Sequence, residues 1–411
     1  MTASRLKRAT GKVGVILRVL APAVSFLALG LPVGASVGTS RLRTELLGWT
    51  IRAERLIGRL PVSVSVAEGR RLVYTHTGNR LRAPASDEKL LLSMALLDRF
   101  GARYRIPTTI EGAPAANGVV KGNLWLVGHG DPELNDAALE RLAHKLRASG
   151  IRTVRGSVIG ATNTFTRERW APGWHPIALQ FIALPTALAF DNNTTADGFV
   201  FDPERRAAAA LTADLRALGV HVAGRASAGR SPARVQSILA TIRSAPLIDI
   251  LRRQNLDSLN LDAEVLTKML GAVASGPPGS TAKGARVIQR WARHCGVEVV
   301  AHDGSGLSYT NRISTTAIVR LLSAADSVGW GSALRSTLPS SGQGTLAGRL
   351  IGVRVRAKTG TLLKQISALS GWVWSQRTRR WAEFSILSRG LPKPQAVLLE
   401  DRIVSTIAKH A

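Results

Sequence analysis

Three short motifs hold residue types that together could carry out nucleophilic catalysis. They are Ser86-Asp87-Glu88-Lys89, Ser258-Leu259-Asn260 and Lys358-Thr359-Gly360. Ser86 and Lys89 stand three positions apart, so on a helix they share one face and the lysine amine can reach the serine hydroxyl. A hydroxyl is a poor nucleophile until a base takes its proton, and a lysine can be that base where burial and a second cation lower its pKa. The spacing therefore predicts Ser86 as a nucleophile and Lys89 as its base.

The other two motifs supply groups that would complete such a site. Lys358 is the candidate second cation. Ser258 and Asn260, two positions apart in an extended turn, are expected to point into one cleft, where they could relay a proton and hold a substrate amide. On an edge strand, Lys358 and Thr359 would bind a carboxylate, and Gly360 would let a substrate approach the strand backbone.

The order and context of the motifs raise their specificity. Ser-x-x-Lys occurs three times, at Ser4, Ser86 and Ser280, but only Ser86 opens a long apolar helix after a strand hairpin. Lys-Thr-Gly occurs once, against a chance expectation below roughly 0.1. The three motifs in this order are typical of β-lactamases and penicillin-binding proteins.

The elements that must position these motifs lie at both ends of the chain. Period-two and helical patterns predict strands at 62–67, 72–76, 365–374 and 381–387, and helices at 43–59, 86–100, 246–254, 261–272, 283–295, 315–326 and 394–410. One antiparallel sheet built from both chain ends, beside a helical cluster, gives an α+β fold. Residues 41–101 and 241–411 would then form the catalytic domain.

In the middle of the chain, 102–240, the pattern of expected short strands and helices predicts an inserted α/β subdomain. Strands are expected at 122–127 and 151–159, and helices at 136–148 and 206–218. This subdomain is expected to fold away from the sheet that carries Lys358.

The 411-residue chain is strongly basic, with 55 Lys and Arg against 27 Asp and Glu, a formal net charge of +28. Such a charge attracts anionic membranes or wall polymers. No nucleic-acid partner is expected, because no aromatic RNA-binding motif, zinc finger or basic zipper accompanies the charge.

The single cysteine, Cys295, excludes a disulfide framework and a Cys-rich zinc site, and its helical phase predicts a buried side chain. The histidines are dispersed, so we expect neither a metal nor another cofactor.

Residues 1–40 are interpreted as a signal peptide or an N-terminal anchor. Arg5, Lys7, Arg8 and Lys12 precede a run of uncharged residues, 19–38, that ends in small residues. Both interpretations place the rest of the chain outside the cytoplasm, in the periplasm or its equivalent.

From about Gly48 to its end, the chain resembles the D-alanyl-D-alanine carboxypeptidase/endopeptidases of the class C low-molecular-mass penicillin-binding proteins. The resemblance rests on the three motifs and on two further segments, Leu124-Trp125-Leu126-Val127-Gly128-His129-Gly130-Asp131-Pro132 and Asp303-Gly304-Ser305-Gly306-Leu307-Ser308 with Asn311-Arg312. The chain departs from the family pattern at Leu259, at Gln343, and in the acidic pair Asp87 and Glu88.

The resemblance implies a transpeptidase-like fold and a serine-type peptidase that acts on peptidoglycan stem peptides ending in D-Ala-D-Ala. Ser86 would form the acyl-enzyme and would also react with β-lactams, while Ser258 would relay a proton to the leaving amine. Backbone N–H groups of Ser86 and Thr361 would form the oxyanion hole. Asn260 would hold the peptide, and Lys358, Thr359 and Thr361 would receive its carboxylate. Carboxypeptidase and endopeptidase action both remain open.

Two alternatives stand beside this interpretation: a β-lactamase-like esterase of the same fold, and a non-catalytic, basic wall-binding protein. Residues outside the motifs receive structural interpretations. Ser305 and Ser308 are expected in a turn, braced by Asp303 and Asn311. The tryptophans are expected in the core, with Trp372 the best candidate for a sugar platform.

Overall fold

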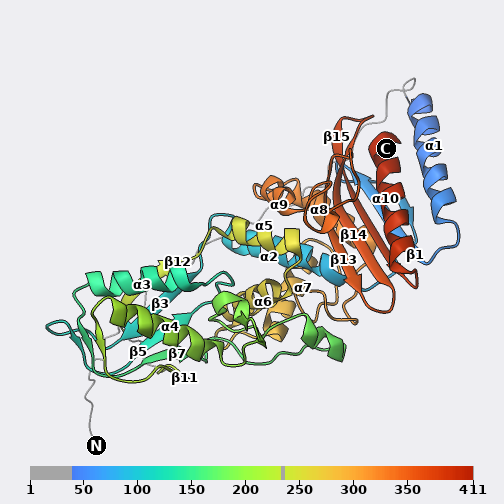
Figure 1. Cartoon of the computed structure of the whole chain (residues 1–411). Helices are drawn as coiled ribbons and strands as arrows, with labels where there is room; N and C mark the ends of the chain where they lie inside the picture. The colour runs from blue at the N-terminus through green and yellow to red at the C-terminus, as the bar shows by residue number, and fades with distance from the viewer. Residues whose placement is uncertain (1–38, 233–236, 411) are drawn as a thin grey trace, which may run out of the picture. The chain divides into compact units, whose positions relative to one another are not determined.

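The computed structural model describes residues 39–232 and 237–410, with side chains from residue 48 onward (Figure 1). Its main sheet has five antiparallel strands in the order β13-β14-β15-β1-β2, which pairs strands from the two ends of the chain. The strands are β1 (Val62–Glu68), β2 (Arg71–His76), β13 (Val355–Leu362), β14 (Ile366–Ser375) and β15 (Arg380–Arg389). The expected α+β fold with a sheet from both chain ends is confirmed.

Helices cover both faces of the main sheet. They are α1 (Thr39–Ile57) and α10 (Lys393–His410) on one side and α8 (Thr315–Ala325) on the other. Val64 and Val66 of β1 pack into the apolar layer beneath α1 and α10. Ser65, between them, is also fully buried, and its Oγ lies 2.8 Å from Thr315 Oγ1 on α8. The alternation of valine and serine predicts a half-buried strand, and this is wrong because α8 supplies hydroxyl partners on the serine face.

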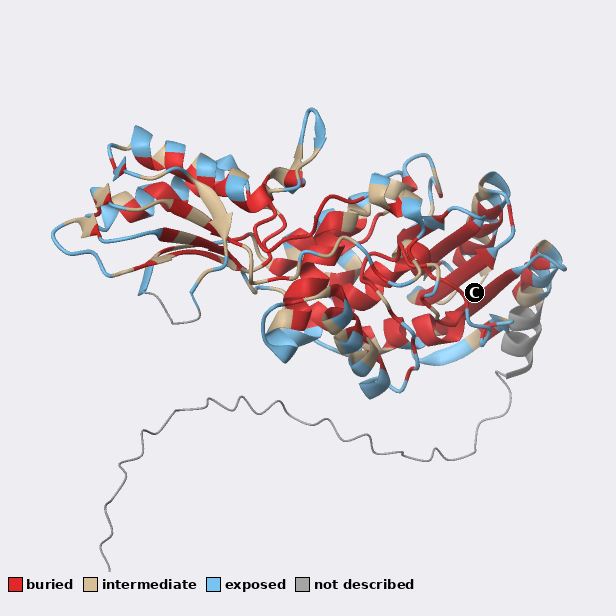
Figure 2. Cartoon of the chain, turned by 90° about the horizontal axis from the view of Figure 1, so that it is seen from below, coloured by how far each residue is buried: buried red, intermediate tan, exposed pale blue. Residues whose placement is uncertain are grey.

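The helical cluster beside the sheet carries two of the three motifs. It contains the 3-10 turn η1 (Ala85–Asp87) and the helices α2 (Glu88–Phe100), α5 (Leu247–Asp257), α6 (Asn260–Ser275), α7 (Thr281–His294) and α9 (Gly331–Thr337). Figure 2 shows this cluster and the main sheet coloured mostly as buried. Every residue of α2 from Glu88 to Leu97 is buried. The helix that presents the candidate catalytic lysine is therefore enclosed by protein on all sides.

Residues 107–243 form sheets of their own, separate from the main sheet. A five-stranded mixed sheet has the order β11-β7-β5-β3-β12, with β3 (Pro107–Gly112), β5 (Leu124–Gly128), β7 (Val158–Ala161), β11 (Ser227–Gly229) and β12 (Ser237–Arg243). A small sheet has the order β10-β6-β4, with β4 (Val119–Val120), β6 (Thr153–Val154) and β10 (His221–Val222). Helices α3 (Asp136–Ala148) and α4 (Pro203–Ala217) pack on each other and on these strands. Strand β12 ends at Arg243, so it crosses the expected boundary at residue 240.

Short elements lie in 160–200, and residues of the first of them line the cavity described below. They are η2 (Pro176–Gln180), η3 (Phe190–Asn193), β8 (Thr194–Thr195) and β9 (Gly198–Phe199); a further turn, η4 (Gly344–Leu346), precedes β13.

Two local predictions are wrong. The single strand expected at 151–159 is two strands in different sheets, because the backbone between them bonds first to Val120 O and then to Gly122 O. Cys295 is exposed, because α7 ends at His294 and Cys295 is its C-cap, so the residue lies outside the helix whose apolar face was expected to bury it.

Within the described ranges no helix is both long enough and apolar enough to cross a membrane. The predicted signal peptide or anchor at 1–40 lies almost wholly outside the described residues, which begin at residue 39.

Candidate active site

Ser86 lies in the tight turn η1, immediately before α2. The preceding residue, Ala85, has φ of 49°, a left-handed conformation that costs free energy for a residue with a Cβ. Two glycines hold this turn in place. A Cβ on Gly306 would lie 1.9 Å from Ala85 O, and a Cβ on Gly360 would lie 2.8 Å from Pro84 O. The serine turn is thus clamped between the 303–308 loop and strand β13.

Lys89 points back from the first turn of α2 to the serine. Its Nζ donates hydrogen bonds to Ser86 Oγ at 3.2 Å, Asn260 Oδ1 at 2.9 Å and the backbone oxygen of Ser305 at 2.5 Å. The side chain is fully buried, and burial lowers the pKa of Lys89 to about 8. An amine with such a pKa is partly neutral near pH 7, as a general base requires.

A sharp turn between α5 and α6 carries the second motif. Ser258 caps α5 in the left-handed region, with φ of 58° and ψ of 41°, and α6 begins two residues later at Asn260. This reversal aims Ser258 Oγ at Lys358 Nζ, 2.9 Å away, and Asn260 at Lys89. Asn260 Nδ2 also donates to Phe181 O at 3.2 Å. Leu259 is half-buried between them and contributes no polar atom.

Lys358 enters from β13 and is as fully buried as Lys89. Its Nζ donates to Ser258 Oγ and, at 2.8 Å, to Thr359 O. Burial lowers the pKa of Lys358 to about 7, and the nearby Lys89 ammonium lowers it further. The two lysines therefore disfavour being charged together.

A cavity of about 350 Å³ opens onto these groups. Its lining includes Ser86, Ser258, Asn260, Thr359 and Thr361 from the predicted set, together with His175, Ile177, Ala178, Phe181, Leu307, Tyr309, Thr345, Leu362 and Leu363. The two lysine amines reach this lining through their hydrogen bonds to Ser86 and Ser258. All eight residues singled out in the sequence thus lie in one neighbourhood.

Gly360 has a neighbour that the sequence does not predict. The space left by its missing side chain is filled by the Ser86 turn, at Pro84 and Ala85, and by Ala368 of β14. The close approach that we expected of a substrate is made here by the protein's own nucleophile turn.

Glu264 and Asp303 organise the site without lining the cavity, and the sequence alone did not assign Glu264 a function. Glu264 accepts hydrogen bonds from the backbone N–H groups of Gly304 and Ser305, at 3.0 and 2.9 Å. These bonds fix the two peptide groups immediately before the Ser305 carbonyl, whose oxygen accepts the hydrogen bond from Lys89 Nζ. Burial raises the pKa of Glu264 to about 7.

The loop that follows is braced by Asp303, as the sequence predicts. Its carboxylate accepts from Trp174 Nε1, Ser308 N and Asn311 Nδ2, each at 2.7 Å, and from Gly306 N at 3.1 Å. Ser305 is fully buried in this loop. Trp372, the candidate sugar platform, is fully buried with its Nε1 bonded to Asp326, so it belongs to the core.

The acidic pair beside the nucleophile is buried. Burial raises the pKa of Asp87 to about 8 and raises that of Glu88 well above its ordinary value. Burial therefore favours the neutral form of both carboxyls, while the charged form of Asp87 would favour the charged form of each lysine. Within the described ranges no group of three or more His, Cys, Asp or Glu is arranged to hold a metal ion.

Comparisons with known proteins agree with this geometry. The model of the D-Ala-D-Ala carboxypeptidase 3 (S13) family matches residues 53–199 and 197–409. A D-alanyl-D-alanine carboxypeptidase of Actinomadura is 30% identical over 85% of this chain and 81% of its own. Carboxypeptidase DacB of Mycolicibacterium smegmatis is 31% identical over 74% of this chain and 71% of its own. Among solved structures, penicillin binding protein 4 of Haemophilus influenzae superposes with a TM-score of 0.75 at 21% identity, covering 87% of this chain and 99% of that one.

Proposed function

The chain belongs to the D-Ala-D-Ala carboxypeptidase 3 (S13) family and is a serine-type D-Ala-D-Ala carboxypeptidase, and on that premise we propose how its own residues perform the reaction. Ser86 is the nucleophile and Lys89 is its general base. Ser258 relays the proton, Asn260 positions the peptide, and Lys358, Thr359 and Thr361 bind the terminal carboxylate.

Acylation begins when Lys89 Nζ takes the proton of Ser86 Oγ, which then bonds to the carbonyl carbon of the penultimate D-Ala. The resulting oxyanion accepts hydrogen bonds from the backbone N–H groups of Ser86 and Thr361. The peptide C–N bond breaks as a proton reaches the leaving amine through Ser258, and D-alanine departs. Deacylation adds water across the new ester and returns the proton to Ser86.

The observation that carries this proposal is the pair of contacts at the cavity floor. Lys89 Nζ lies 3.2 Å from Ser86 Oγ, and Lys358 Nζ lies 2.9 Å from Ser258 Oγ. Each hydroxyl that must lose or pass a proton therefore has its own buried amine. A degenerate wall-binding site needs neither contact, which disfavours the non-catalytic alternative.

The substrate proposed here is a peptidoglycan stem peptide ending in D-Ala-D-Ala, and β-lactams are proposed to acylate Ser86. A structure of the Haemophilus influenzae penicillin binding protein 4 is titled as a complex with a novel β-lactam, which supports the second point. Endopeptidase cleavage of cross-linked peptides would use the same residues. A β-lactamase-like esterase would differ in hydrolysing its penicilloyl-enzyme quickly.

Labelling with a fluorescent penicillin tests the assignment of Ser86. Ser86→Ala should abolish labelling while the variant keeps its melting temperature. Ser280→Ala is the matched control, because Ser280 also stands three residues before a lysine, but its Oγ only caps α7 through Lys283 N. Labelling that survives Ser86→Ala, or that is lost in Ser280→Ala, would refute the assignment.

We also propose that the enzyme is exported through residues 1–40 and works outside the cytoplasm, where its substrate lies. The excess of 28 positive charges is proposed to hold it near anionic membrane or wall polymers.

A further inference from the structure

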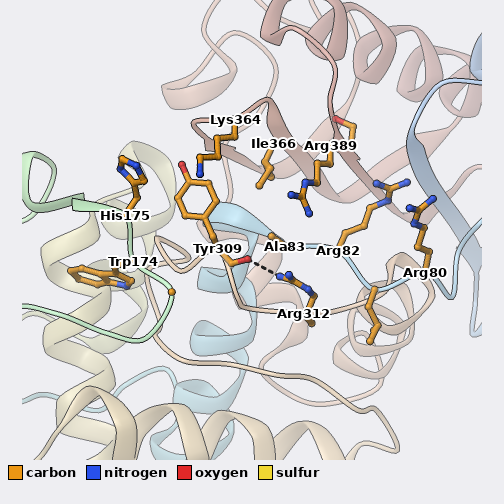
Figure 3. Close-up of a pocket in the computed structure, with 13 residues that line it drawn as sticks. Arg80, Arg82, Ala83, Trp174, His175, Tyr309, Arg312, Lys364, Ile366 and Arg389 are labelled. Carbon is orange, nitrogen blue, oxygen red and sulfur yellow. Dashed lines mark hydrogen bonds between the residues drawn. The ribbon is translucent and has the colours of Figure 1, made fainter. Parts of the chain in front are cut away.

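A second cavity, of about 360 Å³, lies next to the catalytic one and shares His175 and Tyr309 with it (Figure 3). The charged side chains that line this cavity are all positive. The lining includes five cationic side chains, Arg80, Arg82, Arg312, Lys364 and Arg389, and no Asp or Glu. Concentrating five like charges around one hollow is unfavourable unless an anion occupies it.

Arg82 gives the cavity a rigid, buried cation. Arg82 is only 7% exposed. Its backbone N–H donates to Ile313 O, and its backbone oxygen accepts from Ile313 N. Its Nε donates to Ser63 Oγ at 2.8 Å, which leaves the two terminal nitrogens for a ligand. Burial and the charges of Arg80 and Arg389 lower the pKa of Arg82 to about 10. The pattern is that of a buried cation surrounded by other cations rather than by a carboxylate partner.

Arg312 is fixed on another wall of the same cavity. Its NH1 donates to the backbone oxygens of Tyr309 and Asn311, each at 2.7 Å, which orients the guanidinium plane. Arg82, Arg312 and Arg389 line the hollow from three different segments; in Figure 3 the head of Arg82 lies beside that of Arg80, and Arg312 points towards Tyr309. Arg80 and Arg389 are exposed, so a ligand can enter from solvent past them.

The chemistry of the walls selects the ligand. Guanidinium groups bind oxyanions through paired N–H donors, and several of them around one centre suit an anion with several oxygens. A carboxylate carries one charge and two oxygens, whereas a phosphate group carries up to two charges and more oxygens. We propose that this cavity is a phosphate-binding site, separate from the catalytic cleft. The proposal goes beyond the proposed function, because no step of peptide hydrolysis uses these arginines.

The phosphate could be free or could belong to a phosphodiester polymer. A single diester group has one charge and two non-bridging oxygens, so a polymer would match the five cations with several neighbouring groups, whereas free phosphate would do so with one ion. Lys364 marks the border with the catalytic cavity, with its Nζ 5.8 Å from the centre of the Tyr309 ring. Blocking Ser86 with penicillin should therefore leave the phosphate site open, which separates the failure of this proposal from failure of the catalytic assignment.

Calorimetric titration of the penicillin-acylated full chain tests the proposal at constant ionic strength. The probes are inorganic phosphate, a short poly(glycerol phosphate) and citrate, which carries carboxylates alone. The test variant is Arg80→Gln with Arg389→Gln, which removes two exposed cations of the cavity. The matched control is Arg141→Gln with Arg286→Gln, which removes the same charge from exposed positions on α3 and α7.

We expect saturable binding of phosphate at one site, weakened at least tenfold by the cavity variant and unchanged by the control. Polymer that binds tenfold more tightly than phosphate, and that phosphate displaces, identifies the polymer as the ligand source; equal affinities identify free phosphate. Absence of saturable binding, equal loss in both variants, or citrate binding as tight as phosphate would overturn the proposal.

Discussion

The rate at which penicillin acylates the enzyme should follow a bell-shaped pH profile set by the two buried lysines. Burial lowers the pKa of Lys89 to about 8 and that of Lys358 to about 7. Because the two amines interact, the pair loses its two protons in two shared steps. The productive form keeps one proton, with Lys89 neutral as the base and Lys358 charged to hold the carboxylate. Because Lys358 has the lower pKa, this is the minor of the two singly protonated arrangements. The ratio of the two arrangements does not change with pH, so the pH profile follows the singly protonated form as a whole.

The size of the effect follows from these two values. With apparent pKa values of about 7 and about 8, the singly protonated form makes up about 0.6 of the enzyme at pH 7.5 and about 0.09 at pH 6 and at pH 9. The second-order rate constant for acylation, measured by stopped-flow with a fluorescent penicillin, should therefore fall about sevenfold on each side of its maximum.

Lys358→Gln supplies the internal check. Without the second cation the alkaline limb should disappear, and the midpoint of the remaining limb should move to higher pH, because Lys89 no longer has a like charge beside it. Circular dichroism across the range controls for unfolding. A rate that is flat from pH 6 to pH 9, or a variant whose profile keeps the shape of the wild type, would contradict the assignment of the base.

Three further outcomes follow from the structure. Glu264→Ala should leave the buried N–H groups of Gly304 and Ser305 without an acceptor, which lowers the free energy of unfolding in urea by about 1–3 kcal/mol for each group. Acylation should also slow, because the Ser305 carbonyl that accepts from Lys89 is held less firmly. Unchanged stability would argue against the bracing role of Glu264. Gly360→Ala should place a Cβ 2.8 Å from Pro84 O, lowering stability by about 1–3 kcal/mol and slowing acylation, whereas Gly329→Ala, where nothing lies within 4 Å, should do neither; equal effects in the two variants would count against the clamp. Sedimentation with anionic vesicles should fall steeply between 0.1 M and 1 M salt, since the screening length drops from about 10 Å to about 3 Å, while turnover of a small peptide changes much less; salt-independent sedimentation would exclude an electrostatic attachment.

Local patterns carried most of what the sequence could predict. The helical spacing of Ser86 and Lys89 places the two side chains within hydrogen-bond reach, and the alternation in 62–67 and 365–374 locates strands that the structure contains. The hydrophobic period and the residue spacing depend on the geometry of a single helix or strand, so predictions made from them do not depend on distant contacts.

Features that depend on distant contacts were not predictable in this way. The third partner of Lys89 is the backbone of Ser305, 216 positions along the chain, and Glu264 sets that backbone from a different helix. The left-handed backbone at Ser258 could not be predicted, because no glycine stands at that position to indicate it. The prediction that Cys295 is buried failed for a related reason. Its position in the helical pattern matches the apolar face, but the helix ends at His294, and Cys295, as the C-cap, is exposed.

The role of Ser86 is tested by the product formed from a peptide ending in D-Ala-D-Ala, read by mass spectrometry together with the mass of the trapped enzyme. With Ser86 as the nucleophile we expect release of a single D-alanine per peptide, an acyl group located on the tryptic fragment that contains Ser86, and neither product with Ser86→Ala. D-Alanine release that persists in Ser86→Ala, or an acyl group located on any other residue, would contradict it.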